Sequence, residues 1–275
     1  AVEACFSSAG QLCVSIERLY VPEEKYEEFK TAFVSRVEHL ALGSALDWDA
    51  DIGSLVSQAQ LETVTSHVKD AVAHGATVLT GGKGRPDLGP YFYEPTVLEG
   101  VTETAECFAG ETFGPLVSLY PYKTTEEAVA LANGGEYGLN ASLWGKPREA
   151  KAIANRIKAG TVNINEGFSA TFGSVDAPMG GMRQSGLGRR QGAEGILRYT
   201  EPQSIGVQRL MPMAGPHAMQ SRRWATPRTA GSATDTRDYT AGQLGPEALL
   251  AAVPQLAELA RIDATQVFSV DSKDM

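Results

Sequence analysis

Stretches typical of strands and of helices alternate along most of this chain, and this alternation limits the possible folds more than any other feature. Apolar residues at helical spacing predict helices at residues 1–6, 22–37, 57–73, 126–132 and 147–158. Short apolar, β-favouring runs predict strands or extended segments at residues 15–21, 76–80, 91–98, 116–120, 141–144 and 161–165. Such alternation indicates a layered α/β domain with a largely parallel sheet.

The helical stretches also predict which side chains face the core. In the helix at 22–37 the apolar stripe consists of Tyr26, Phe29, Phe33 and Val37. In the helix at 57–73 it consists of Leu61, Val64, Val68 and Val72. Thr124 and Glu127 form a predicted capping box, and Gly160 is the predicted end of the helix that starts at Pro147.

Composition narrows the class of protein. The net charge of −9 argues against a nucleic-acid partner, and no apolar run reaches the length of a membrane span. The three cysteines are too few and too scattered for a disulfide framework, so we expect a cytoplasmic protein. Neither a CxxC nor an HExxH pattern occurs, and no metal is expected.

The first candidate for chemistry is Cys13, at the end of Gly10-Gln11-Leu12-Cys13. A thiol held between a short helix and a following strand can be both exposed and rigidly placed, as a nucleophile requires. The alternative is a buried structural cysteine, which is what most cysteines are. A cysteine–histidine pair is disfavoured because no histidine lies nearby in the sequence.

Two glycine-rich motifs follow. Residues 110–116 place Glu111 and Phe113 between Gly and Gly-Pro, which predicts a rigid turn that presents both side chains, or a β-turn with Phe113 in the core. Residues 178–190 predict a glycine-rich basic loop. The two interpretations are a loop that faces an anionic substrate and a plain surface loop. The loop lacks the features of a P-loop or a dinucleotide-binding fingerprint.

The end of the chain has a different pattern. Residues 194–210 predict a helix followed by a strand that has no partner in the chain, which indicates an oligomer contact. Residues 211–230 are rich in proline, glycine, alanine and arginine, and predict a disordered linker or a foreign junction. Beyond them, a helix at 247–260 and a strand at 266–270 form a fragment too short to bury a core of its own.

Five motifs together resemble the aldehyde dehydrogenase superfamily, in its order and at its spacing. They are Gly10-Gln11-Leu12-Cys13, Glu111-Thr112-Phe113-Gly114-Pro115, Tyr137-Gly138-Leu139, Gly160-Thr161-Val162-Asn163-Ile164-Asn165 and the segment Pro178 to Arg189. The resemblance covers residues 1–210. It implies the three-layer α/β catalytic domain of that family over 1–195 and its C-terminal oligomerisation strand over 196–210, hence a homo-oligomer.

The resemblance also implies roles for individual residues. Cys13 matches the catalytic nucleophile, whose thiolate attacks an aldehyde carbon, and its backbone N–H helps to hold the oxyanion. Glu111 matches the residue that binds the nicotinamide ribose, and Phe113 the residue beside the nicotinamide end. The implied cofactor is NAD or NADP, and the implied product is a carboxylic acid formed through a thioester.

The substrate implied by the closest branch is succinate semialdehyde. Ser174 lies where that branch places a serine near the substrate carboxylate, and Arg183 in the basic loop is the second substrate-binding candidate. Ser7 departs from the pattern, because some of those enzymes carry an arginine at that position for the same carboxylate.

In this family the glutamate base, the oxyanion asparagine and the cofactor domain precede the cysteine, so they would fall before Ala1. We therefore expect the isolated chain to be a piece of a longer protein with negligible dehydrogenase activity. The alternative class is a non-catalytic oligomerisation fragment that keeps the same fold.

Residues 225–275 resemble the start of a bacterial L-asparaginase. Thr229, Tyr239 and Ser272 match its nucleophile, loop tyrosine and substrate-binding serine, but Pro227 and Arg228 replace the glycines of the nucleophile turn. We expect residues 231–275 to be an incomplete fragment without amidohydrolase activity.

Overall fold

The computed structural model describes residues 1–44, 49–207 and 209. Its contacts divide the chain into two units, Ala1–Gln203 and Ser204–Met275. The predicted linker at 211–230 and the asparaginase-like segment lie outside the described residues. The fold that follows is that of the first unit.

The main sheet has four strands in the order β1-β4-β3-β2. Strands β1 (Arg18–Pro22), β4 (Leu116–Tyr122) and β3 (Thr96–Glu99) are parallel, and β2 (Thr77–Thr80) joins the edge of β3 in antiparallel orientation. The apolar side chains of β4 are buried on both faces, as a central strand of a layered α/β fold requires. This sheet confirms the predicted α/β class.

Helices α2 (Tyr26–Glu38) and α3 (Gln58–Ala73) carry the apolar stripes that the sequence predicts. In α2, Tyr26, Phe33 and Val37 are buried, and the Phe33 ring stacks between those of Phe6 and Phe29. Helix α1 (Val2–Phe6) supplies Phe6, and α4 (Glu106–Ala109) is a single turn.

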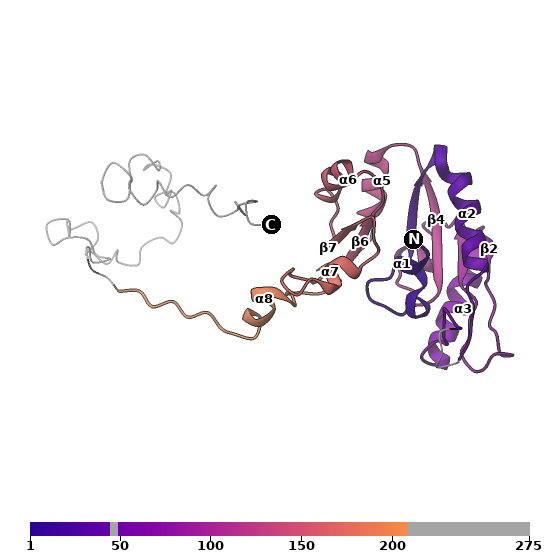
Figure 1. Ribbon diagram of the computed structural model, residues 1–275, viewed down its shortest axis with the longest axis horizontal. Coiled ribbons are helices and arrows are strands. Elements are labelled where there is room, and N and C mark those ends of the chain that lie inside the picture. The colour runs from indigo at the N-terminus through magenta and orange to yellow at the C-terminus, as the bar shows by residue number, and fades with distance from the viewer. Residues whose placement is uncertain (45–48, 208, 210–275) are drawn as a thin grey trace, which may run out of the picture. The chain divides into compact units, whose positions relative to one another are not determined.

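A smaller parallel pair, β6 (Asn140–Leu143) and β7 (Thr161–Ile164), forms the second part of this unit. Helices α6 (Pro147–Ala154) and α7 (Ser169–Gly173) both pack against β7 (Figure 1). Helix α5 (Thr125–Ala132) follows β4, while β5 (Tyr137–Gly138) pairs with β8 (Met182–Arg183) in antiparallel orientation. Helix α8 is Gly192–Leu197.

The capping box of α5 is present. The Thr124 side chain accepts the N–H of Glu127, while the Glu127 carboxylate accepts the N–H of Lys123, one residue earlier than expected.

Two helix predictions were wrong in detail. Val72 is 47% exposed, and Ala71 takes its place in the core, because the step of three residues from Val68 follows the buried face of α3 better than the step of four. Helix α6 ends at Ala154 rather than near Gly160. After α6 the N–H groups of Arg156 and Ile157 donate to carbonyls three residues back, and the Asn133 amide bonds to the carbonyl of Arg156 and to the N–H of Lys158.

The expected strand after α8 is not found in residues 201–207, the part of the closing segment that the structure describes. Ile205 and Val207 are exposed there, with no regular secondary structure. A strand needs a neighbour to pair its backbone groups, and these residues have none within the described chain. No helix among the described residues is both long and apolar enough for a membrane span.

Candidate active site

Cys13 follows a strained turn at the end of α1. The residues of the 3-10 turn Ser7–Gly10 include Ser8, Ala9 and Gly10, whose φ angles are +53°, +55° and +70°. A left-handed conformation costs an L-residue about 1–2 kcal/mol, so it persists only where surrounding contacts enforce it. Cys13 itself is exposed and the next residue, Val14, is buried.

Gln11 fixes this turn from one side. Its Nε2 donates to the carbonyls of Ser8 and Ser54, at 3.2 and 3.3 Å, and its Oε1 accepts the N–H of Val56 at 2.8 Å. The Cys13 N–H donates to no acceptor among the described residues. A free N–H beside an exposed thiol suits stabilisation of an oxyanion formed at that thiol.

Asn140 holds the backbone on the other side of Cys13, at Val14, and the sequence prediction missed this residue. Its Nδ2 donates to the carbonyls of Val14 and Gly167 at 2.8 and 3.1 Å. Its Oδ1 accepts from Asn163 Nδ2 and lies 3.0 Å from Thr161 Oγ1, whose one proton is shared with the carbonyl of Leu139. Asn140 directly follows the Tyr137-Gly138-Leu139 motif, and that adjacency is the signal that could have identified it.

The other two thiols are buried. Burial raises the pKa of Cys5 to about 12 and that of Cys107 to about 11. Because the thiolate is the reactive form, both are poor nucleophiles at neutral pH. Cys13 is thus the accessible thiol of the chain.

The turn that carries Glu111 and Phe113 lies against the Cys13 turn. A side chain at Gly10 would collide with the carbonyl oxygen of Gly114, so the two backbones are in close contact. Glu111 is exposed, whereas Phe113 is half-buried and has a φ of +51°. The structure therefore brings Cys13 and the Glu111–Phe113 turn into one region, and Phe113 is not a fully buried core residue.

Glu17 is a second residue that the sequence prediction missed. Its carboxylate accepts hydrogen bonds from the backbone N–H groups of Thr112 and Phe113, in the turn beside Cys13. Burial raises the pKa of Glu17, and the hydrogen bonds from the turn oppose that shift. The available signal was the one acidic residue in the segment that joins Cys13 to β1.

Ser174 and Arg183 are not joined to Cys13 by any contact among the described residues. Ser174 is exposed at the C-terminal end of α7. Arg183 Nη1 donates to the backbone carbonyls of Asn133, at 2.8 Å, and Gly135. Within the basic loop, Arg189 Nη1 donates to the carbonyls of Gly181 and Gly188.

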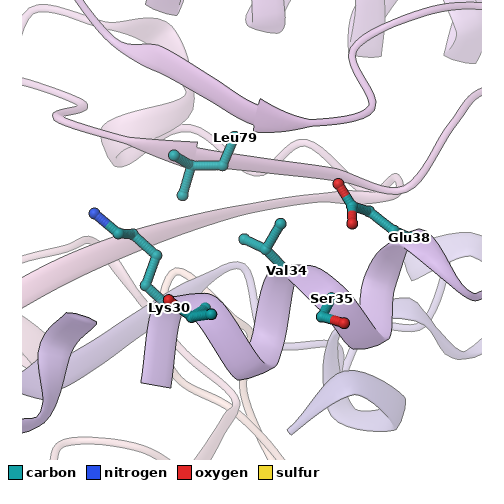
Figure 2. Close-up of a pocket in the computed structure, with 6 residues that line it drawn as sticks. Lys30, Val34, Ser35, Glu38 and Leu79 are labelled. Carbon is teal, nitrogen blue, oxygen red and sulfur yellow. The ribbon is translucent and has the colours of Figure 1, made fainter. Parts of the chain in front are cut away.

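A surface pocket of about 360 Å³ lies away from these turns, between α2 and Leu79 of β2 (Figure 2). None of the predicted site residues lines it. Its lysine, Lys30, is already paired with Glu27 and Glu99. Within the described ranges, no group of three or more histidine, cysteine, aspartate or glutamate side chains could hold a metal ion.

Comparison with known proteins identifies the family of this chain. Residues 1–205 match the model of the Aldehyde dehydrogenase family. The chain belongs to that family.

The similarity to individual relatives is consistent with this family. A putative succinate-semialdehyde dehydrogenase [NADP(+)] of Mycolicibacterium smegmatis is 52% identical over 225 residues, which are 82% of this chain and 44% of that protein. The mitochondrial succinate-semialdehyde dehydrogenase of Oryza sativa subsp. japonica is 38% identical over 200 residues, 72% of this chain and 37% of that protein. The chain thus spans less than half the length of these relatives.

A solved structure shares the fold. Betaine aldehyde dehydrogenase of Staphylococcus aureus in complex with NAD+ superposes with a TM-score of 0.68 at 33% identity, over 76% of this chain and 44% of that one. A second structure of that enzyme contains a cysteine modified by BME.

Proposed function

We propose that residues 1–205 form the catalytic part of an NAD(P)-dependent aldehyde dehydrogenase, with Cys13 as the nucleophile and succinate semialdehyde as the substrate. The observation that carries this proposal is the contact between the Cys13 turn and the Glu111–Phe113 turn at Gly10 and Gly114. This contact supports the proposal because the two backbone segments that carry the thiol and the expected cofactor-binding side chains lie against each other.

In the proposed reaction the Cys13 thiolate forms a C–S bond with the aldehyde carbon. The Cys13 N–H, free among the described residues, then holds the resulting oxyanion. A nicotinamide cofactor bound beside Glu111 and Phe113 would supply the acceptor for the hydride that leaves this carbon. Water then cleaves the thioester on Cys13, which yields the carboxylic acid and regenerates the thiol.

The residues present fit part of a dinucleotide cofactor. Glu111 is exposed and can accept hydrogen bonds from ribose hydroxyls, and Phe113 offers a half-buried ring beside it. The chain carries no glycine-rich phosphate loop with the dinucleotide pattern. We infer that the remaining cofactor contacts and the general base come from residues outside this chain, and that the chain alone oxidises aldehydes negligibly.

The substrate assignment draws on the names of the relatives. Both the Mycolicibacterium and the Oryza proteins are named for succinate semialdehyde. Ser174 is the better candidate for the substrate carboxylate, because its hydroxyl is exposed and makes no hydrogen bond with the described residues. Arg183 is the second candidate, although its Nη1 is already bonded to two backbone carbonyls.

A hybrid enzyme tests the proposal. Residues 1–205 of this chain replace the matching segment of the Mycolicibacterium relative, and NADPH formation from NADP+ and succinate semialdehyde is followed. We expect the hybrid to be active and Cys13→Ser to lower kcat by at least about a thousandfold. The matched control, Cys107→Ser, removes a buried thiol and should keep most of the activity. An equally active Cys13→Ser hybrid would refute the proposed role.

The remaining assignments are tested separately. We propose the domain boundaries given above, with residues 196–210 as an oligomer contact. Sedimentation of the chain as a strict monomer would contradict the oligomer contact.

The asparaginase-like assignment of residues 225–275 stays a prediction. Release of ammonia from asparagine by the purified chain would contradict our expectation that the segment is inactive.

A further inference from the structure

The Glu17 side chain connects the Cys13 segment to the Glu111–Phe113 turn. Its Oε1 and Oε2 accept the Thr112 N–H at 3.2 and 2.9 Å, and Oε1 also accepts the Phe113 N–H at 2.9 Å. Successive backbone N–H groups that converge on one anion form the arrangement known as a nest. In this protein the anion is a carboxylate of the same chain.

The turn that the nest holds is strained. Phe113 has a left-handed backbone, a conformation that is energetically unfavourable for an L-residue. Hydrogen bonds to a charged acceptor are stronger than neutral ones, so the Glu17 carboxylate can offset this cost. On the opposite side, Gln60 Nε2 donates to the carbonyls of Thr112 and Phe113 at 2.7 and 2.9 Å. The turn is therefore held through both its N–H and its C=O groups.

The ionised form of Glu17 is energetically unfavourable at this position. Burial disfavours its ionised form, and the nearby Glu111 carboxylate adds to the effect, so the pKa of Glu17 is raised. A partly buried carboxylate that served only packing could be replaced by an apolar side chain without this penalty. What an apolar side chain could not do is accept the N–H groups of Thr112 and Phe113.

We propose that Glu17 is a positioning residue, which locks the Glu111–Phe113 turn in place relative to Cys13. Glu17 lies four positions after Cys13, directly before β1, and the turn also touches the Cys13 loop at Gly10. Glu17 thereby ties the side chains expected to meet the cofactor to the segment that joins the nucleophile to β1. The consequence for cofactor binding rests on the proposed function, but the locked turn can be tested without it.

Hydrogen exchange on the 275-residue chain tests whether Glu17 holds the Glu111–Phe113 turn in place. In Glu17→Gln we expect the amides of Thr112 and Phe113 to exchange at least about tenfold faster, because the amide side chain keeps one acceptor and loses the other. Glu17→Ala should accelerate exchange further. The matched control Glu28→Gln, at an exposed position of α2, should behave as the wild type. Peptides from α3 and β4 should exchange at the wild-type rate in all variants.

Two results would overturn the inference. One is wild-type exchange at residues 112–113 in both Glu17 variants. The other is acceleration spread evenly over the sheet and helices, which would mean that Glu17 only supports global stability. In the hybrid enzyme, Glu17→Gln should raise KM for NADP+ about tenfold with little change in kcat. An inactive wild-type hybrid would count against the proposed function alone, while the exchange result would still decide the role of Glu17.

Discussion

Burial separates the three cysteines into two kinds. Cys5 and Cys107 are enclosed in the core, and burial raises the pKa of each by two units or more, to about 12 and about 11. Cys13 is exposed at the end of a turn that Gln11 and Asn140 hold in place. A nucleophile needs both access and fixed orientation, and of the three only Cys13 has both.

Alkylation with iodoacetamide at neutral pH should therefore modify Cys13 in the native chain while Cys5 and Cys107 remain protected. Each unit of raised pKa lowers the thiolate fraction about tenfold, and burial adds steric protection. We expect the two buried thiols to react at least about a hundredfold more slowly than Cys13, as measured by peptide mass spectrometry. Denaturant serves as the control, because it should equalise the three rates. Labelling of Cys107 as fast as Cys13 in the native chain would contradict this account.

The sequence predicted some of these residues and missed others for a physical reason. Cys13, Glu111 and Phe113 lie in short motifs rich in glycine, which local pattern recognition can find. Glu17 and Asn140 act through partners 95 and 126 residues away, at Thr112 and Val14. A pairing over such a distance depends on which strands lie side by side, and local spacing does not encode that.

Helices and strands with a clear period of apolar residues were predicted well. The residues at which these elements end were predicted less accurately. The stripe of α2 and the buried strand β4 follow from apolar spacing alone. The end of α6 does not, because the Asn133 side chain, from the end of α5, bonds to the backbone of residues 156–158. Tertiary hydrogen bonds of this kind override local propensity at element boundaries.

Helix α7 depends on a carboxylate that precedes it. The Glu166 side chain accepts hydrogen bonds from Ser169 Oγ at 2.7 Å and from the Ala170 N–H at 2.9 Å. Burial opposes its ionisation, but the hydrogen bonds from residues 168–170 together lower the pKa of Glu166 to about 2. A carboxyl whose pKa is lowered on folding stabilises the protein above its unfolded pKa, and this stabilisation is lost as the pH falls toward the folded value.

We therefore expect Glu166→Gln to destabilise the chain at neutral pH by about 1 kcal/mol, a figure reduced for the partial exposure of this carboxylate. The difference in unfolding free energy between the variant and the wild type should shrink as the pH falls from about 5 to about 2. Glu166 becomes protonated over this range and is then uncharged, as the glutamine of the variant is. Urea unfolding at a series of pH values measures it. The control Glu103→Gln, at an exposed carboxylate, should show no such dependence. A difference that stays constant down to pH 2 would contradict the assignment.

At the scale of the whole molecule, the chain holds one part of a family architecture. It spans less than half the length of its relatives, and the family match covers residues 1–205. Within that part, the thiol and the expected cofactor-contacting turn are assembled and supported by Gln11, Glu17 and Asn140. The account therefore predicts a nucleophile that is in place independently of any cofactor.

Acylation of the native chain by p-nitrophenyl acetate shows whether the nucleophile is preassembled, because this reaction needs neither cofactor nor aldehyde. Peptide mass spectrometry locates the acetyl group, and hydroxylamine identifies it as a thioester. We expect an acetyl thioester on Cys13, formed faster than on the same residue in the unfolded chain and missing from Cys13→Ser. No acetyl group on Cys13, or a rate no higher than in the unfolded chain, would contradict it.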